Sequence, residues 1–310
     1  MQAIDVLCVG ATSVDMVFRT PCHPAPDEKI SASEMVLCGG GPAANAAVMV
    51  SKMGLKSAFA GYLGSDLYGR IHMEELSAAG VDTALVVRGD HPTPVSAVIV
   101  KPSGERSVIN YRAAGAVLDR DRIAMTDMHP RVILFDGHEP ELSSALLDHA
   151  RLKGITTVLD AGSLNRGTLE LYHKVDHLVC SERFAHEITG APSPEAAMAD
   201  LFAPARSVVI TLGGSGLLWK HAGGDGRLPA FSVDVKDTTG AGDVFHGAFA
   251  GSLAIGRPWD ELLAYASAAA ALSCTRLGAR AGIPEGAEVE AFLRRTSCLT
   301  MHPPNARHKG

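Results

Sequence analysis

Short apolar runs, several of them rich in β-branched residues, alternate with longer stretches of helical period along most of the chain. The runs that fit buried strands are residues 4–10, 132–135, 156–159 and 208–212. The stretches with apolar residues at helical spacing are residues 43–53, 69–79, 142–152 and 244–253. Alternation of this kind is typical of βαβ units, and it predicts an α/β fold with a mainly parallel sheet between layers of helices.

Two segments, residues 15–38 and 93–112, depart from this alternation and carry little helical signal. The second reads PVSAVIV, then a KPSGE turn, then RSVINYR, which is typical of a hairpin. The two segments either pair as a small antiparallel sheet beside the main one or are separate surface excursions. We predict a single domain over residues 1–295 with both segments inserted in it, followed by a disordered tail over residues 296–310.

Charge and cysteine usage narrow the class of protein. The 310 residues include 28 Lys and Arg against 34 Asp and Glu, a net charge of −6 without a basic run, so nucleic acid is not an expected partner. The six cysteines are scattered without zinc-type spacing, and no basic region precedes the first apolar run, which favours a cytoplasmic protein. The longest apolar stretch, residues 262–274, is too short to span a membrane and predicts a buried helix.

The most informative run is DTTGAGDVF, residues 237–245, where a polar loop becomes a helix of small apolar residues. Gly240, Ala241 and Gly242 let backbone N–H groups converge, and the first helical turn adds unpaired donors, so the run predicts an anion hole. Phosphoryl transfer requires such a hole. Asp243, at its edge, is a candidate base for an attacking hydroxyl, whereas an isolated aspartate at this place would more often cap the helix.

A second glycine cluster, GGGPAANAA over residues 39–47, also ends an extended segment and opens a helix. Gly40, Gly41 and Asn45 offer backbone and amide groups to a polyhydroxylated ligand, although a tight strand-to-helix turn explains the cluster about as well. The run matches neither the Walker loop nor the dinucleotide fingerprint. Asp15, five residues past Gly10, falls at the edge where parallel sheets bind ligands, or is a simple turn residue.

These two runs, about 200 residues apart and in this order, closely resemble the two signatures of the PfkB family of sugar kinases, the ribokinase-like proteins. The resemblance implies a three-layer αβα Rossmann-like domain with a small β-sheet lid, ATP as phosphoryl donor, Mg²⁺ on the phosphates and a sugar acceptor. It makes Asp243 the base, residues 240–242 the anion hole, and Asp15, Gly40, Gly41 and Asn45 sugar ligands. The run VITLGGSG, residues 209–216, resembles the family's nucleotide loop, so the implied nucleotide-binding residues are Thr211, Gly213, Gly216 and Thr239.

Finer similarity points to a ketose substrate. The strings GERSVINY, VDVKDTTGAGDVFHGAFA and CTRLGARAGIP resemble the subgroup that contains bacterial sulfofructose kinase, with ketohexokinases more distant. In this resemblance Lys29 and Asn110 contact the anionic end of the substrate, but His138 stands where an arginine would bind the sulfonate. Arg112 shares a strand face with Asn110 and either supplies the missing charge or lies solvated at the lid edge.

The metal site departs from the family pattern, because the ends of its N-x-x-E motif are Ser181 and Phe184 here. Glu182 or Glu187 could substitute through water, or Mg²⁺ could rest on phosphates and solvent alone, so no metal ligand is assigned. Residues 275–282, with Asp237 and Thr239, resemble a loop that binds a monovalent cation such as K⁺ in some relatives. The resemblance also implies a homodimer formed through the lid.

The leading interpretation is an ATP-dependent kinase that phosphorylates a primary hydroxyl of a ketose or related sugar. Action on 6-deoxy-6-sulfofructose is the alternative substrate. A nucleoside kinase is less favoured, since Phe18 and Tyr111 are the only aromatic residues in the two lid segments. A sugar sensor without catalytic activity would not need Asp243, and the complete GAGD run argues against one.

Overall fold

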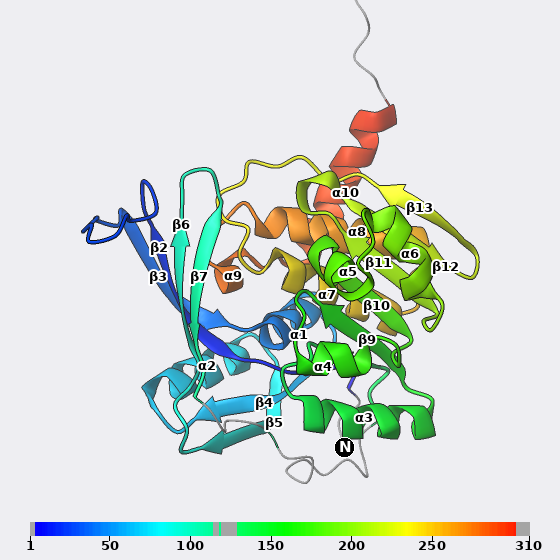
Figure 1. The fold of residues 1–310 in the computed structure, drawn as a ribbon, viewed down its shortest axis with the longest axis horizontal. Coiled ribbons are helices and arrows are strands. Elements are labelled where there is room, and N and C mark those ends of the chain that lie inside the picture. Colours follow the sequence, from blue (N-terminus) through cyan, green and yellow to red (C-terminus); the bar gives the residue numbers. More distant parts are fainter. Residues whose placement is uncertain (1–3, 114–117, 119–128, 302–310) are drawn as a thin grey trace, which may run out of the picture.

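A nine-stranded sheet forms the centre of the computed structural model, which describes residues 4–113, 118 and 129–301. Its strands run in the order β13-β12-β11-β10-β9-β8-β1-β4-β5 (Figure 1). Seven of them are parallel, and β12 and β13 pair antiparallel at one edge. Their bounds are β1 (Val6–Val9), β4 (Ser57–Gly64), β5 (Asp82–Gly89), β8 (Val132–Phe135), β9 (Thr156–Ala161), β10 (His177–Ser181), β11 (Ser207–Thr211), β12 (Leu217–His221) and β13 (Gly224–Leu228).

Helices cover both faces of this sheet, because its strands are apolar on both sides. Leu7 and Val9 belong to one buried cluster, and Val6 and Cys8 belong to the other. The first cluster is completed by α3 (Pro140–Lys153), α4 (Arg166–Leu171), α5 (Glu182–Thr189) and α6 (Pro194–Phe202). The second is completed by α1 (Pro42–Lys52), α2 (Leu67–Ala78), α7 (Ala241–Ala254), α8 (Trp259–Ser273) and α10 (Gly286–Met301), with the short α9 (Ala279–Gly282) beside α8. The three-layer αβα prediction is confirmed.

The strand order reverses between β1 and β8. From β1 the chain continues through β4 and β5 on one side, and from β8 it continues through β9 to β11 on the other. In open α/β sheets ligands bind outside the carboxyl ends of the strands at such a reversal. The fold therefore directs a ligand to the space beyond Val9 and Phe135, next to the N-termini of α1 and α7.

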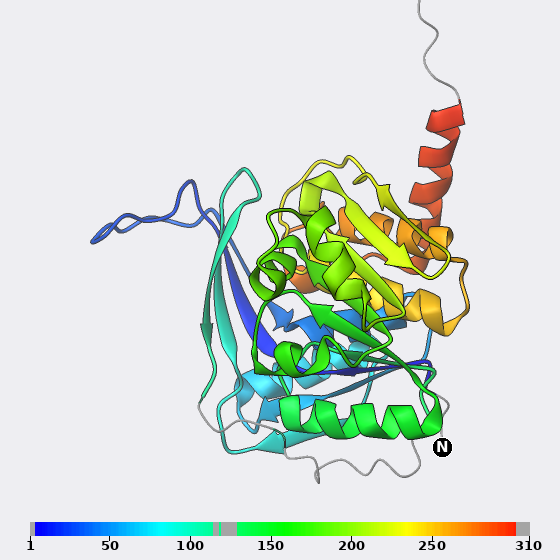
Figure 2. The same cartoon turned by 45° about the vertical axis from the view of Figure 1, so that its right-hand side comes forward.

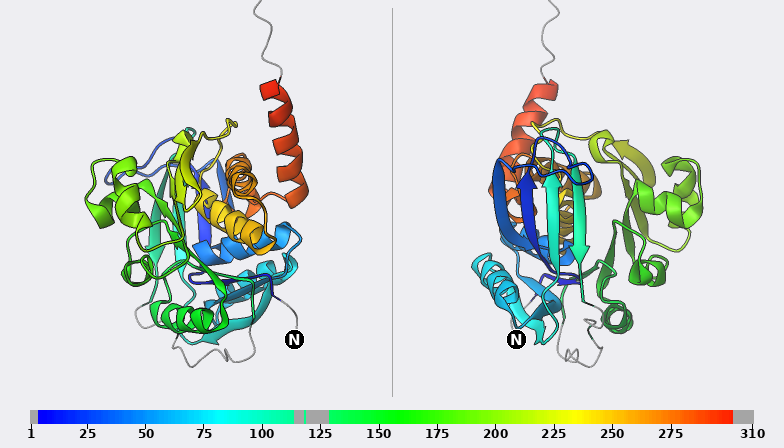
Figure 3. Two further views of the ribbon diagram at one scale, coloured as in Figure 1. Left: turned by 90° about the vertical axis from the view of Figure 1, so that its right-hand side faces the viewer. Right: turned by 60° about the vertical axis from the view of Figure 1, so that its left-hand side comes forward.

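A four-stranded sheet forms the lid beside this edge, with the order β3-β2-β6-β7 (Figure 3). Its strands are β2 (Ser13–Arg19), β3 (Glu34–Gly40), β6 (Val95–Val100) and β7 (Arg106–Tyr111). The prediction of an antiparallel lid is wrong in one pairing, because β2 and β6 run parallel. Each leaves the main sheet after a parallel strand, β1 or β5, at the same edge, so the two strands run outward in the same direction.

The lid has a body-facing side and an outer side that differ in composition. Asp15, Ser96 and Asn110 pair in register across β2, β6 and β7, so they share one face. Val17 and Val98 lie on that same face and pack against Leu277 of the main domain, which makes it the inner face. The outer face is apolar and carries Met16, Phe18, Met35, Leu37, Ile99, Ile109 and Tyr111.

Two further predictions concern the helices near the C-terminus. The apolar stretch over residues 262–274 lies within α8, with Leu262, Leu263 and Ala266 buried, which confirms a buried helix. No helix in the described part of the chain could cross a membrane. The helix α10 continues to Met301, beyond residue 296, where the sequence predicts a disordered tail to begin. The remainder of that predicted tail, residues 302–310, lies outside the described residues.

Candidate active site

The glycine-rich run forms the start of α7 at the carboxyl edge of the sheet. Gly240 is the N-cap residue with a φ of 78°, in the left-handed region that favours glycine. A Cβ at Gly242 would meet no heavy atom of the described chain within 4 Å, so the space in front of the first turn is open. Unpaired backbone donors of a helix N-terminus beside open space suit a phosphate group. The predicted anion hole thus lies at a helix N-terminus with open space beside Gly242, although the Ala241 N–H donates to the Thr238 carbonyl at 3.3 Å.

Asp243 lies in the first turn of α7, next to the second glycine cluster. Asn45, in the first turn of α1, donates a hydrogen bond from Nδ2 to Oδ2 of Asp243 at 2.8 Å. Asn45 is almost fully buried, so the residues packed around it define the environment of its amide. The structure thus brings together the predicted base and a predicted sugar ligand at the junction of two helix N-termini.

Asp15 forms the lid side of the same junction. Its carboxylate accepts a hydrogen bond from the Ser13 hydroxyl at 2.7 Å, and burial raises its pKa. A Cβ at Gly40 would come within 2.2 Å of Asp15 Oδ2, so the glycine leaves room for the carboxylate. Gly41 has a different reason to be glycine, since its φ is 93° and a Cβ would lie 2.4 Å from the Ala11 carbonyl oxygen. Its role visible here is the turn into α1.

The strand reversal holds a buried carboxylate that the sequence analysis did not single out. Asp136 follows β8 directly, and its Oδ2 accepts hydrogen bonds from the backbone N–H groups of Ala11 at 2.8 Å and Ala43 at 3.1 Å. It thereby ties the end of β1 to the start of α1. His138 Nδ1 lies 3.3 Å from Asp136 Oδ1, and this carboxylate raises the pKa of His138 to about 9. His138 is therefore charged at neutral pH, but its charge is paired.

A second buried pair lies behind the anion hole. The His246 ring on α7 has Nδ1 2.6 Å from the Gly242 carbonyl oxygen and 3.2 Å from Asp160 Oδ2. Its Nε2 lies 3.2 Å from the Val179 carbonyl oxygen. The ring can donate to both carbonyls when both nitrogens carry hydrogen, with Asp160 as counter-ion. Burial raises the pKa of Asp160 to about 6. This pair connects the first turn of α7 to β9 and β10.

The predicted nucleotide residues lie at the end of β11 and in the short 3₁₀ turn η2 (Gly213–Ser215). Thr211 is the last residue of β11. A Cβ at Gly213 would meet no described heavy atom within 4 Å, so the space beside this turn is open. Gly216, in contrast, has a φ of 90° and would place a Cβ 2.0 Å from the Leu228 carbonyl oxygen. This close backbone approach is sufficient to explain a glycine at position 216, without a contact to a ligand.

Thr239 is held by the loop itself. Asp237 Oδ1 accepts hydrogen bonds from the Thr239 N–H at 2.8 Å and from its hydroxyl at 2.6 Å. The other carboxylate oxygen of Asp237 accepts from the Gly278 N–H at 2.8 Å. The buried Asp237 therefore joins the loop before α7 to the 275–282 segment, the two segments that the sequence resemblance places around a monovalent cation.

The structure offers no protein cage for a divalent metal within the described ranges, where no three His, Cys, Asp or Glu side chains gather to hold one. Ser181 Oγ caps α5 by accepting from the Phe184 N–H at 3.0 Å, and the Phe184 ring lies in the core. Glu182 is exposed, and Glu187 pairs with Arg183 at 2.7 Å. The residues present do not fit a metal site built from side chains.

The remaining predicted substrate residues are distributed around the lid. Asn110 lies on the inner face but on the exposed edge strand β7. Lys29 lies in the exposed connection between β2 and β3, residues 20–33, which projects away from the body in Figure 2. Arg112 pairs with the buried Glu139 at 2.6 Å and is not a solvated side chain at the lid edge.

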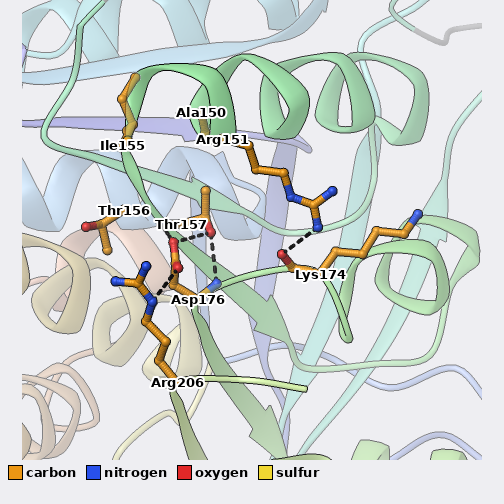
Figure 4. Close-up of a pocket in the computed structure, with 9 residues that line it drawn as sticks. Ala150, Arg151, Ile155, Thr156, Thr157, Lys174, Asp176 and Arg206 are labelled. Atoms are coloured by element: carbon orange, nitrogen blue, oxygen red, sulfur yellow. Dashed lines mark hydrogen bonds and ion pairs between the residues drawn. The ribbon is translucent and has the colours of Figure 1, made fainter.

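A cavity of about 210 Å³ lies elsewhere, at the amino ends of β9 to β11 (Figure 4). Its polar groups satisfy one another: Arg206 pairs with Asp176 at 2.9 Å, and Arg151 donates to the Lys174 carbonyl at 3.1 Å. We do not assign it to the reaction, because sites of parallel sheets form at the opposite edge.

Comparison with known proteins agrees with this geometry. A family model described as pfkB family carbohydrate kinase matches residues 3–286 of the 310. The chain belongs to this family. The pfkB protein described here is therefore a carbohydrate kinase, a phosphotransferase with an alcohol group as acceptor.

Several relatives of this pfkB kinase carry the name ribokinase. The ribokinase of Haemophilus influenzae is 27% identical over 298 residues, which cover 92% of this chain and 97% of that protein. The structure of a Thermotoga maritima ribokinase has a TM-score of 0.82 at 30% identity, covering 94% of this chain and 99% of that chain. A ribokinase from Arabidopsis thaliana, complexed with ribose and ATP, has a TM-score of 0.79 at 26% identity, with coverage of 94% and 99%. These relatives support the family and not the sulfofructose kinase or ketohexokinase subgroup specifically.

Sequence reasoning missed four polar residues that organise the site of this kinase: Asp136, His246, Glu75 and Arg280. Asp136 had a usable signal, since it directly follows an apolar strand at the edge where ligands bind. His246 lies three residues after the predicted base, on a helix whose pattern is otherwise apolar. Arg280 has its hydrogen-bond partners 208 and 235 residues away, so no local pattern could reveal them.

Proposed function

We propose that this kinase transfers the γ-phosphoryl group of ATP to a primary hydroxyl of a ketose or related sugar. The observation that carries the proposal is the placement of Asp243. It lies at the open N-terminus of α7 and accepts a hydrogen bond at 2.8 Å from Asn45, a predicted sugar ligand. A base must reach the acceptor hydroxyl close to the phosphoryl group that is transferred. Asp243 lies where backbone N–H groups suited to phosphate adjoin the predicted sugar ligands, so it meets this requirement.

The reaction follows from these positions. Asp15 and Asn45 hold the sugar, and backbone N–H groups at the start of α7 hold the phosphate oxygens. The acceptor oxygen forms a bond to the γ-phosphorus while the bond from this phosphorus to the bridging oxygen breaks. Asp243 takes the hydroxyl proton, and ADP leaves with the bonding electrons. Charge that develops on the phosphate oxygens is stabilised by the donors at the start of α7.

The charges at the far end of the site favour a neutral ketose over a sulfonated one. His138 is paired with Asp136 at 3.3 Å, and Arg112 is paired with Glu139 at 2.6 Å. A sulfonate would have to compete with both carboxylates for these cations. Lys29, the third cation considered for this end, lies in an exposed connection that projects from the body (Figure 2).

Ribose is the second candidate, because the relatives that cover nearly the whole chain are named ribokinase. A nucleoside is less favoured on structural grounds. Phe18 pairs in register with Ile99, and Tyr111 with Val95, on the outer face of the lid, so neither ring faces the site to stack on a base.

A substrate panel tests the proposal. Fructose, tagatose, ribose, 6-deoxy-6-sulfofructose and adenosine are each assayed with ATP and Mg²⁺ by ADP release, with and without K⁺. We expect the highest kcat/KM with a neutral ketose. Turnover of ribose alone would replace the ketose by a pentose. ADP release with none of the five, in a protein that binds a sugar, would support the sensor interpretation instead.

We further propose that two copies of this kinase pair through their lids. The outer lid face exposes Met35 by 59%, Ile109 by 67% and Tyr111 by 60%. An exposed apolar face on a four-stranded sheet marks an interaction surface in a soluble protein. A second copy presents the same apolar face, so a twofold pairing covers both at once.

A further inference from the structure

A buried arginine, Arg280, contacts Asn45, one of the proposed sugar ligands, and has no role in the reaction described above. Arg280, on α9, is 9% exposed and is surrounded by residues from α1, α2 and β3. Its Nε donates to Asn45 Oδ1 at 3.1 Å, and its Nη2 donates to His72 Nε2 at 3.0 Å. A buried guanidinium costs free energy unless its donors are used, so its position beside the site calls for a function.

The groups around Arg280 restrict it to one orientation. His72 is fully buried, and burial together with the charge of Arg280 holds its pKa well below the usual range, so it accepts as a neutral ring. Glu75 Oε2 lies 3.8 Å from Nη1 and also accepts the Gly39 N–H at 2.7 Å. The guanidinium is thereby held on one side by His72 and Glu75 of α2, and its Nε donates to Asn45 of α1.

The contact with Asn45 determines how that amide is turned. A guanidinium only donates hydrogen bonds, so it selects the Oδ1 side of the amide. The Nδ2 group must then point the opposite way, where it donates to Asp243 at 2.8 Å. Without Arg280, the amide could rotate and present oxygen to the carboxylate, which would push Asp243 from its place.

We propose that Arg280 is a positioning residue that acts through Asn45 to aim the base Asp243 at the acceptor hydroxyl. The inference rests on the proposed function of Asp243. The contacts run from Glu75 to Arg280, from Arg280 to Asn45 and from Asn45 to Asp243. We call this series the relay, because each residue fixes the orientation of the next. Arg280 Nη1 is buried and lies 3.8 Å from Glu75 Oε2 without a hydrogen bond, and the proposal does not involve direct contact with the sugar.

A double-mutant cycle tests this relay. Arg280→Met and Asn45→Ala are compared singly and together, with kcat and the KM values of sugar and ATP as readouts. Displacement of a catalytic group by about 1 Å can cost on the order of 10²-fold, so Arg280→Met should lower kcat to that extent with the KM of ATP unchanged. In the Asn45→Ala background, the same substitution should change kcat by no more than about twofold, because the residue through which it acts is gone.

Controls separate positioning from folding. Arg257→Met removes a partly buried arginine paired with Glu290 at 3.0 Å, away from the site, and should leave kcat unchanged. If Arg280→Met does not fold, Arg280→Lys and Glu75→Gln enter the same cycle. The lysine lacks the forked guanidinium, and the glutamine removes the charge that faces Arg280 Nη1 at 3.8 Å. Equal losses from Arg280→Met with and without Asn45, or a loss confined to the KM of the sugar, would overturn the relay. Asp243→Asn runs in parallel: if it keeps full activity, the proposed function fails and not this inference alone.

Discussion

Asn45 and Asp243, 198 residues apart in sequence, are joined by a hydrogen bond of 2.8 Å between two helix N-termini. This contact joins the proposed sugar ligand to the proposed catalytic base. It also connects the two glycine-rich runs, one proposed to bind the sugar and the other the phosphate.

Asp243→Asn should abolish the base while keeping the shape of the side chain. We expect kcat to fall by about 10²- to 10⁴-fold with the sugar Kd almost unchanged, as is usual for loss of a general base. Steady-state kinetics and calorimetric titration measure the two quantities. Asp225→Asn, on the exposed edge strand β13, is the matched control and should behave as the wild type. A folded Asp243→Asn protein with near-normal kcat would refute the assignment.

Gly242→Val should remove activity without unfolding the protein. A Cβ at this position meets no described atom within 4 Å, so the valine would fill the space for the phosphate. We expect a loss of roughly 2–4 kcal/mol in transition-state stabilisation, similar to removal of an oxyanion-hole donor. The melting temperature should hardly change.

Gly240→Val is the contrasting control for the anion hole. Here φ is 78° and the new Cβ would lie 2.8 Å from the Ala279 Cβ. Strain of this kind costs on the order of 1–3 kcal/mol, so this variant should melt earlier. If Gly242→Val loses activity only in proportion to lost folded protein, then Gly242 is structural and the phosphate binds elsewhere.

His138 should keep its charge across neutral pH. A histidine with the usual pKa of about 6.5 would lose its charge between pH 6 and 8. The adjacent Asp136 carboxylate raises this pKa to about 9, so the ring is protonated below that value and loses its proton as pH rises through it. Binding of 6-deoxy-6-sulfofructose should therefore be flat from pH 6 to 8 and weaken only near pH 9.

The same pairing affects stability. A raised histidine pKa in the folded state stabilises the fold below the unfolded value, and this contribution disappears as pH rises through about 9. His138→Asn should therefore lower the melting temperature at pH 7 more than at pH 10. The affinity for 6-deoxy-6-sulfofructose is measured at the same pH values. If it changes steeply between pH 6 and 8 in the wild type but not in His138→Asn, the pairing of His138 with Asp136 is weaker than the structure indicates.

Arg106 should hold the lid against the loop before α7. Its Nη1 donates to the Thr238 hydroxyl at 2.8 Å, and Thr238 also contacts the Gly104 carbonyl at 3.4 Å. One hydrogen bond of this kind contributes about 0.5–1.5 kcal/mol, so Arg106→Ala should raise the KM of the sugar about two- to tenfold. kcat should stay within about twofold. A fall in kcat at unchanged KM would place Arg106 in the chemical step instead.

Ile109→Asp should separate the proposed dimer. The side chain lies on the apolar outer face of the lid, where a buried carboxylate would be costly. Sedimentation equilibrium should show dimers for the wild type and monomers for this variant. Leu152→Asp, on a still more exposed site of α3, controls for a general effect of charge. A wild-type monomer at all concentrations would contradict pairing through the lid.

Local sequence patterns predict the layers of the fold and single out the two glycine-rich runs as the candidate site. Residues 132–135 are the strand β8 as predicted, and the DTTGAGD run begins α7 where the pattern turns apolar. Such features depend on neighbours within a few residues, because strand and helix periods and glycine backbone freedom are local properties. The sequence also led to the lid hairpin, whose turn residues lie between its two strands.

The pairing of the lid strands and the meeting of distant polar groups depend on the tertiary structure. The parallel pairing of β2 with β6 depends on where two distant strands leave the main sheet. The raised pKa of His138 depends on the fixed geometry of its ring against Asp136, and the orientation of Asn45 depends on Arg280, 235 residues away. Contacts across such separations form when the core brings the elements together, so a local pattern does not encode them.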